Sequence, residues 1–228
     1  MGDRTKPPAM TWRLLAFAGF FITCLLTANV VSTKLVYAGG LILPAGVIVF
    51  PLSYVMGDVL TEVYGYAVVR RIIWLGFACN LLMVAVIWLA GHLPPAPVWQ
   101  GQAAYSEVFA QTPRILAASF LAYLGGSFAN SYVLAKLKIA TQGRWLWTRT
   151  LGSTVVGQGL DSLLFVVLAF AVLVPPAVLG GIILSQWLVK VAYEAAVTPI
   201  TYKVVHWLKA REGVDVYDRE TDFNPLRL

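Results

Sequence analysis

Charged residues are scarce in this chain. Asp, Glu, Lys and Arg make up 12% of the 228 residues, against about 25% in an ordinary soluble domain, while 59% of the residues are hydrophobic. This balance excludes an ordinary soluble domain and predicts an all-α integral membrane protein. The net charge of +6 is better explained by Lys and Arg beside hydrophobic spans than by nucleic-acid binding, so no nucleic-acid partner is expected.

Cysteine and histidine are also rare. Cys24 and Cys79 lie in apolar runs without CxxC spacing, so neither a disulfide nor a metal pair is expected. His92 and His206 stand alone, and we expect no metal or cofactor. The sequence has no GxxxxGK[ST] motif for ATP and no Ser-His, His-Glu or His-Asp pair at useful spacing, so we expect no enzyme.

Long apolar runs fill most of the sequence. Runs of about 20 residues, the length that crosses the hydrocarbon core, predict six transmembrane helices. They cover residues 11–36, 41–61, 72–92, 113–136, 150–174 and 176–207. The proline-rich segment 93–112 is too polar to span, and we expect a surface loop with a short helix there. Residues 1–210 thus form the transmembrane domain, and residues 211–228 a polar cytoplasmic tail.

Basic residues lie almost entirely on one side of the predicted spans. The opposite side retains only Lys34 and Arg114, and Lys190 lies within the sixth span. Because short cytoplasmic loops are enriched in Lys and Arg, the basic side is predicted to be the cytoplasm. Six spans then place both termini there.

Two carboxylates lie within hydrophobic sequence at the end of the second span. Asp58 and Glu62 are four residues apart, so a helix places them on one face, with Tyr54 one turn earlier. An ionised Asp near the bilayer centre costs about 2.5–3.5 kcal/mol on insertion scales, so a carboxylate kept there indicates a function. This stripe is a candidate wall of a site for a polar ligand.

The depth of Asp58 depends on where its helix begins. A helix from residue 41 places Asp58 close to the cytoplasmic boundary. A helix that begins after a loop at residues 44–46 and runs on towards Arg70 places Asp58 at mid-membrane, level with Asp161. We expect this second register. A short internal echo, in which Asp58 corresponds to Asp161 and Asn29 to Asn130, favours it and would make the fold a 3+3 inverted repeat.

The sixth span carries a possible ion pair and a helix breaker. Lys190 and Glu194 are four residues apart, so they either neutralise one another or belong to a site. Thr198-Pro199 is expected to interrupt that helix, because proline removes a backbone hydrogen bond.

A family resemblance rests on the run from Phe50-Pro51 to Gly65. Asp58, Leu60-Thr61-Glu62 and Tyr64-Gly65 resemble the hallmark of the queuosine precursor transporter family, also called the vitamin uptake transporter family. Matching positions extend over nearly the whole chain: Asn29, Ser32, Lys34, Arg70, Asn130, Lys138, Arg149, Ser153, Gln158, Asp161, Lys190, Thr198, Pro199 and Tyr202. The resemblance implies import of 7-cyano-7-deazaguanine or its aminomethyl analogue across a bacterial inner membrane, for tRNA modification.

Such a cargo suits the polar residues of the spans. A deazaguanine edge offers adjacent N–H donors and one carbonyl acceptor, so a carboxylate, an amide or lysine, and an aromatic ring would bind it. The candidate substrate-binding residues are Asn29, Lys34, Phe50, Tyr54, Asp58, Glu62, Asn130, Gln158, Asp161, Trp187, Lys190 and Glu194.

Two transport mechanisms remain open from the sequence. The first is secondary or facilitated transport by alternating access, which we expect. The alternative is a substrate-binding membrane subunit of an ATP-driven vitamin-type importer, since six small spans suit that role as well. Glycines that allow close packing serve one chain or a dimer interface equally well, and a homodimer surrounded by membrane lipid is our expectation.

Overall fold

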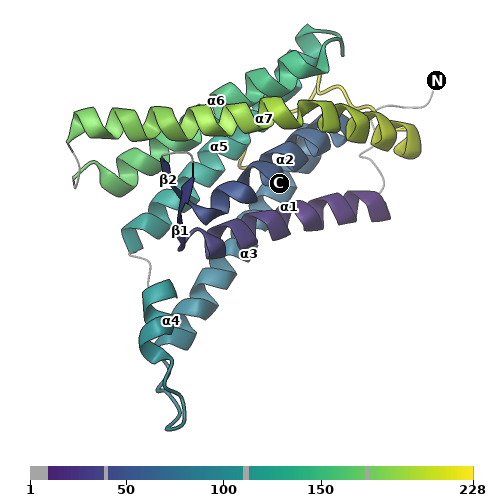
Figure 1. The fold of residues 1–228 in the computed structure, drawn as a ribbon. Helices are drawn as coiled ribbons and strands as arrows, with labels where there is room; N and C mark the ends of the chain where they lie inside the picture. The colour runs from purple at the N-terminus through teal and green to yellow at the C-terminus, as the bar shows by residue number, and fades with distance from the viewer. Residues whose placement is uncertain (1–9, 39–40, 110–112, 173–174, 228) are drawn as a thin grey trace.

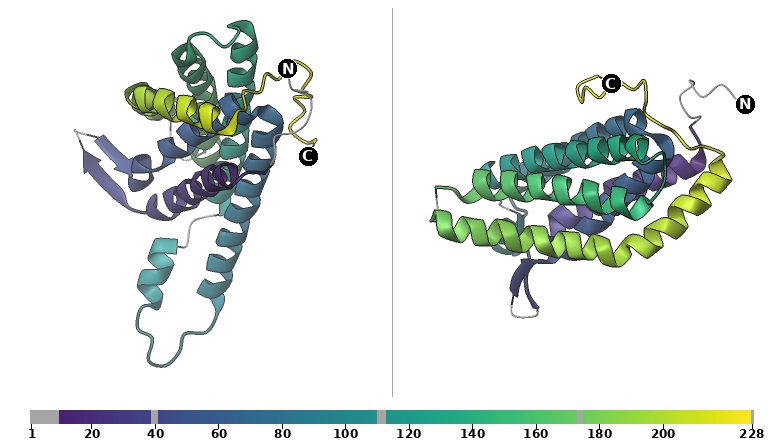
Figure 2. Two further views of the ribbon diagram at one scale, coloured as in Figure 1. Left: turned by 90° about the vertical axis from the view of Figure 1, so that its right-hand side faces the viewer. Right: turned by 90° about the horizontal axis from the view of Figure 1, so that it is seen from above.

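A computed structural model describes residues 10–38, 41–109, 113–172 and 175–227. Almost all of the structure is helical, and the helices assemble into a bundle from which α3 and α4 project on one side (Figures 1 and 2). The prediction of an all-α chain is therefore confirmed apart from one small hairpin.

Helix α1 is followed by a β-hairpin that the sequence did not predict. α1 covers Trp12–Val31, and its first turn is capped by the Thr11 hydroxyl, which accepts a hydrogen bond from the Leu14 amide at 3.2 Å. Strands β1 (Leu35–Ala38) and β2 (Leu41–Pro44) then pair antiparallel, and a short 3-10 helix, η1, covers Ala45–Ile48. The predicted spans 11–36 and 41–61 are therefore wrong at residue 36 and at residue 41, because the backbone there forms the hairpin.

Helix α2 covers Phe50–Tyr64, with a proline in its first turn, where no intrahelical partner is lost. Its start after the hairpin agrees with the second of the two registers, and Asp58 lies near its middle. The helix does not run on to Arg70, because Gly65 turns the chain at a φ of 83°. α3 (Tyr66–His92) begins directly afterwards, earlier than the expected residue 72.

The remaining helices follow the predicted order. The short helix α4 (Gln102–Phe109) lies in the proline-rich segment, as expected, and α5 and α6 cover Pro113–Ala140 and Leu146–Phe170. α7 covers Pro176–Glu212 without a break. The interruption expected at Pro199 is wrong: the helix continues through it, and the Thr198 hydroxyl bonds the Glu194 carbonyl at 2.8 Å.

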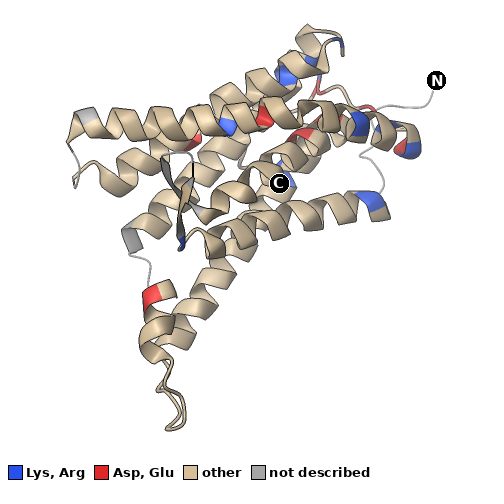
Figure 3. Ribbon diagram, viewed as in Figure 1, with Lys and Arg blue, Asp and Glu red and all other residues tan. Residues whose placement is uncertain are grey.

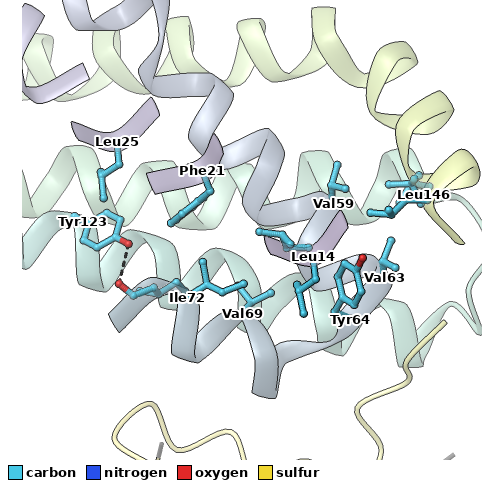
Figure 4. Close-up of a cluster of buried hydrophobic side chains, with 14 residues drawn as sticks. Leu14, Phe21, Leu25, Val59, Val63, Tyr64, Val69, Ile72, Tyr123 and Leu146 are labelled. Carbon is cyan, nitrogen blue, oxygen red and sulfur yellow. Dashed lines mark hydrogen bonds between the residues drawn. The ribbon is translucent and has the colours of Figure 1, made fainter. Parts of the chain in front are cut away.

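Helix α2 is the buried centre of the bundle. It contacts α1, α3, α5 and α7, and Val59, Leu60 and Val63 are completely buried. Around them, apolar side chains of α1, α3 and α5 form one cluster, part of which Figure 4 shows. α5 and α6 pack closely where Gly126 meets Gly157: a Cβ at Gly157 would lie 2.9 Å from the Gly126 carbonyl oxygen.

Long apolar helices identify a multi-pass membrane protein. Among the described residues, five segments are long and apolar enough to cross a bilayer: Trp12–Val31, Ala45–Tyr64, Tyr66–His92, Leu146–Phe170 and Val178–Glu212. Lys and Arg gather around the start of α1, the turn between α5 and α6 and the end of α7 (Figure 3). We call this region, which also holds the α2–α3 turn, the basic end.

Candidate functional site

Asp58 is the centre of a polar cluster inside the bundle. Its side chain on α2 is fully buried, and one carboxylate oxygen accepts a hydrogen bond from the Asn130 amide of α5 at 2.5 Å. The other oxygen, Oδ2, is buried without a partner in the described part of the chain. The Asp58 carboxylate also interacts with the carboxylate of Glu194 on α7 and with the side chain of Ser153 on α6. Four helices therefore meet at Asp58.

Several other buried polar atoms near Asp58 lack a hydrogen-bond partner. Within the described ranges these are Tyr54 Oη, Asn130 Oδ1, Thr154 Oγ1, Gln158 Oε1 and Glu194 Oε1. Each unsatisfied buried group costs about 1–3 kcal/mol, so a cluster of them indicates a place where a ligand supplies the missing partners. Most of these atoms are acceptors. The site therefore suits a ligand rich in N–H donors.

Asp161 and Lys190 form an ion pair beside this cluster. Lys190 of α7 donates to Asp161 of α6 at 2.5 Å, and its ammonium lies 5.0 Å from the centroid of the Phe50 ring. The Tyr54 ring lies 5.5 Å from Phe50, and a Cβ at Gly126 would meet both Tyr54 Oη and Asp161 Cβ within 2.7 Å. The pairing of Lys190 with Glu194 is thus wrong, because Lys190 reaches across to α6.

Glu62 lies in a separate ion cluster at the basic end. Its carboxylate accepts two hydrogen bonds from Arg149, at 2.8 and 3.1 Å, and one from Lys209 at 2.6 Å. The Lys138 ammonium is 3.7 Å away and also bonds Asp215 at 2.5 Å. Cations from α5, α6 and α7 therefore surround one carboxylate of α2, an arrangement that holds helices together.

Three further candidate residues lie away from Asp58. The Asn29 amide of α1 donates to Asn80 of α3 at 3.0 Å. Lys34 is exposed in the turn before β1. Trp187 donates its indole N–H to the Val155 carbonyl at 2.9 Å. The structure thus brings together Tyr54, Asp58, Asn130 and Glu194, with Phe50, Asp161 and Lys190 beside them, and it buries Gln158 on α6.

Neither Asn80 nor Thr154 was among the candidate residues identified from the sequence. Asn80 is buried, and it is the one asparagine in the expected third span, residues 72–92. A lone amide in an apolar run was the signal that could have identified it. Thr154 lies one turn before Gln158 on α6, so helical spacing relates the two.

The helices around Asp58 are closed. The space between Ser53, Tyr54, Ser127 and Asn130 measures about 10 Å³, room for at most one water molecule. A ligand larger than a water molecule does not fit in this space.

Comparison with known proteins gives the family. The model of the family described as "Putative vitamin uptake transporter" matches residues 44–204. The chain is 32% identical over 190 residues to the "Probable queuosine precursor transporter" of Bacillus subtilis (strain 168), covering 83% of this chain and 82% of that protein. It is 30% identical over 125 residues to the "Queuosine precursor transporter" of Escherichia coli (strain K12), covering 55% and 54%. No solved structure matches. This chain therefore belongs to the vitamin uptake transporter family.

Proposed function

We propose that this protein imports queuosine precursors, 7-cyano-7-deazaguanine or 7-aminomethyl-7-deazaguanine, across the bacterial plasma membrane. Both similar proteins carry queuosine precursor transport in their names. The observation that carries the proposal for this chain is the group of buried, unpaired acceptors around Asp58.

The chemistry of this group suits a deazaguanine. Asp58 Oδ2 and Glu194 Oε1 can accept the adjacent N–H donors of the base, because a carboxylate accepts paired donors well. The Gln158 amide carries both a donor and an acceptor for the carbonyl edge. The rings of Phe50 and Tyr54 supply an aromatic surface for the flat face.

The closed centre favours alternating access as the mechanism. The base would reach Asp58 when the helices part on one side, and leave when they part on the other. Secondary or facilitated transport needs no further protein, whereas the alternative, a binding subunit of an ATP-driven importer, does. Uptake by the purified chain in liposomes, without ATP, separates the two mechanisms.

The topology that we propose has six spans and both termini in the cytoplasm. α5 is 28 residues long and packs against α6, so it is the natural sixth span. The basic end then faces the cytoplasm. Two halves, α1–α3 and α5–α7, would form an inverted repeat in which Asp58 and Asp161 both lie on the middle helix. We also propose a homodimer, which chemical cross-linking in membranes would test.

Substitution of Asp58 tests the function. We expect Asp58→Asn to reduce uptake about ten- to a hundredfold, since hydrogen bonds to a charged group are worth about 1.5–3 kcal/mol. The measurement is queuosine in tRNA of cells that lack precursor synthesis and receive each precursor in turn. Asp222→Asn, in the tail, is the matched control. Normal uptake by Asp58→Asn at equal membrane abundance would refute the proposal.

A further inference from the structure

A second cavity lies at the end of the bundle opposite the basic end. It measures about 390 Å³ and is enclosed by the final turns of α1, the outer half of α3, the helix α4 and the first half of α5. Its volume falls within the range of about 300–1,000 Å³ typical of small-molecule sites. In the topology proposed above, this cavity faces the outside of the cell.

Hydrogen bonds hold the walls of this cavity together, and the ionisable side chains among its described lining residues are those of His92 and Tyr105. α4 is attached to α3 by the Tyr105 hydroxyl, which donates to the Ile87 carbonyl at 3.1 Å, and by Gln102, which donates to the Gly91 carbonyl at 3.1 Å. Trp88, Tyr105 and Phe120 provide aromatic surface. None of the described lining residues is Asp, Glu, Lys or Arg, so the walls favour a neutral ligand.

Two amides contribute polar groups to the cavity, together with the side chains of Thr33, His92, Ser106 and Ser119. Asn29 donates to Asn80 at 3.0 Å, and this single bond leaves both side chains with further donor and acceptor capacity. Asn80 is only 2% exposed, and burying its amide costs free energy unless hydrogen bonds compensate for the lost water. Such a residue therefore indicates a role in packing or in binding. Amides between aromatic rings are what a flat heterocycle with N–H and carbonyl groups requires.

The outer cavity and the small space beside Tyr54 and Asn130 are both lined by residues of α1, α3 and α5. On α1 the chain passes from Phe21 at the small space to Asn29 in the outer cavity, and on α3 it passes from Ile73 to Asn80. On α5 the corresponding residues are Ser127 and Phe120. These three helices therefore run from one place to the other.

An apolar layer lies along this stretch of the helices. Phe21, Leu25 and Tyr123 are each at most 4% exposed and belong to the buried apolar cluster (Figure 4). Along α1, Leu25 lies between Phe21 of the small space and Asn29 of the outer cavity, and along α5, Tyr123 lies between Ser127 and Phe120. The Tyr123 hydroxyl donates to the Ile73 carbonyl at 3.0 Å, and Gly76 makes room for it, since a Cβ there would lie 2.8 Å from that hydroxyl. One hydrogen bond and apolar contacts hold this layer.

We propose that the outer cavity is a capture site that binds a neutral, planar nitrogen heterocycle between Asn29–Asn80 and the aromatic walls. The layer of Phe21, Leu25 and Tyr123 is the outer gate that separates this site from Asp58. This inference rests on the proposed function, because binding at the capture site would be the first step of import.

Cysteine protection tests the capture site. In a Cys24→Ala, Cys79→Ala background, Ser119→Cys places a thiol in the cavity and Val98→Cys places a control thiol in the exposed loop before α4. We expect a membrane-impermeant maleimide, added outside, to label both. 7-Cyano-7-deazaguanine should slow the labelling of Ser119→Cys several-fold and leave Val98→Cys unchanged. Ser106→Cys on α4 is a second reporter should Ser119→Cys not reach the membrane.

Two added substitutions separate this inference from the function itself. Asn80→Leu should keep the labelling and lose the protection, whereas Asp58→Asn should lose uptake and keep the protection. The capture site is refuted if both cavity thiols resist labelling, if the base protects neither of them, or if Asp58→Asn abolishes protection. Protection without uptake by the parent protein would instead overturn the transport function alone.

Discussion

Asp58 and Glu62 have opposite roles although they are one turn apart on α2. Asp58 has one neutral partner, Asn130, and keeps an unpaired oxygen. Glu62 is bonded by Arg149 and Lys209, with Lys138 close by. The number of cations around each carboxylate thus distinguishes a group that is available to a ligand from one that secures the fold.

Removing the charge of Glu62 should destabilise the protein. Glu62→Gln leaves cations of three helices, two of them buried, without their shared counter-charge, and breaking a buried pair costs about 3–5 kcal/mol. We expect a lower melting temperature in detergent and less protein in the membrane. The control is Glu107→Gln on the exposed helix α4, which should leave both unchanged. A stable Glu62→Gln protein with selectively lost uptake would contradict the structural role.

The sequence identified the polar residues of the spans, but it did not identify the partners that they bind. Helical spacing placed Tyr54 and Asp58 on one wall, and the buried Asn130 and Gln158 were identified as polar residues of the spans. Asp161 and its partner Lys190 are 29 residues apart in the sequence, and Glu62 and Arg149 are 87 residues apart. Both pairings depend on how the helices that carry these residues pack together. A single sequence does not contain that information.

At the scale of elements, the sequence did not predict the hairpin formed by β1 and β2. A short apolar run suits a buried helix and a strand alike, so hydrophobicity alone did not show that these residues form a hairpin. The backbone bond from the Ala45 amide to the Lys34 carbonyl, at 2.8 Å, closes the hairpin. The helix break at Gly65 was similarly hidden, because one glycine inside a long run predicts a turn only weakly.

The contact of α5 with α6 should not tolerate a side chain at Gly157. A Cβ there would lie 2.6 Å from the Cβ of Asn130 and 2.9 Å from the Gly126 carbonyl, so Gly157→Ala forces the helices apart and displaces Asn130. We expect a loss of about 1–3 kcal/mol in stability, measured as a lower melting temperature, together with weaker uptake.

Gly180 provides the matched control for this change. A Cβ at this position of α7 meets nothing within 4 Å. Gly180→Ala should therefore leave stability unchanged or raise it by up to about 1 kcal/mol through helix propensity. Equal melting temperatures for the two alanine variants would show that the α5–α6 contact is not tight.

At the scale of the molecule, the segment that follows α7 returns across the basic end. Both carboxylate oxygens of Asp218 accept the Tyr66 amide, at 3.0 and 3.1 Å, at the start of α3. Arg70 donates to the carbonyls of Asp222 and Asn224, and Trp74 donates to that of Pro225. These contacts join the end of the chain to the α2–α3 turn.

Asp218→Ala should loosen this attachment. Loss of a helix cap costs about 0.5–2 kcal/mol, so we expect faster hydrogen exchange of the first amides of α3, with Glu220→Ala as the exposed control. Burial raises the pKa of Asp215, but Lys138 and Lys209 outweigh it and hold this pKa below its usual value. The ion pairs of Asp215 are therefore fully formed above the ordinary carboxyl pKa and lost only in acid, so the protection of these amides relative to their intrinsic exchange rates should not change around neutral pH. Unchanged exchange in Asp218→Ala would contradict the cap.

The pairing of Asp161 with Lys190 also determines how transport relates to the membrane potential. While the two side chains stay together they carry no net charge, and the potential exerts no net force on them. A step that separated them would move charge through the field, at about 2.3 kcal/mol for each elementary charge across 100 mV. The voltage dependence of uptake of a neutral base therefore reports whether α6 and α7 travel together or part during the cycle.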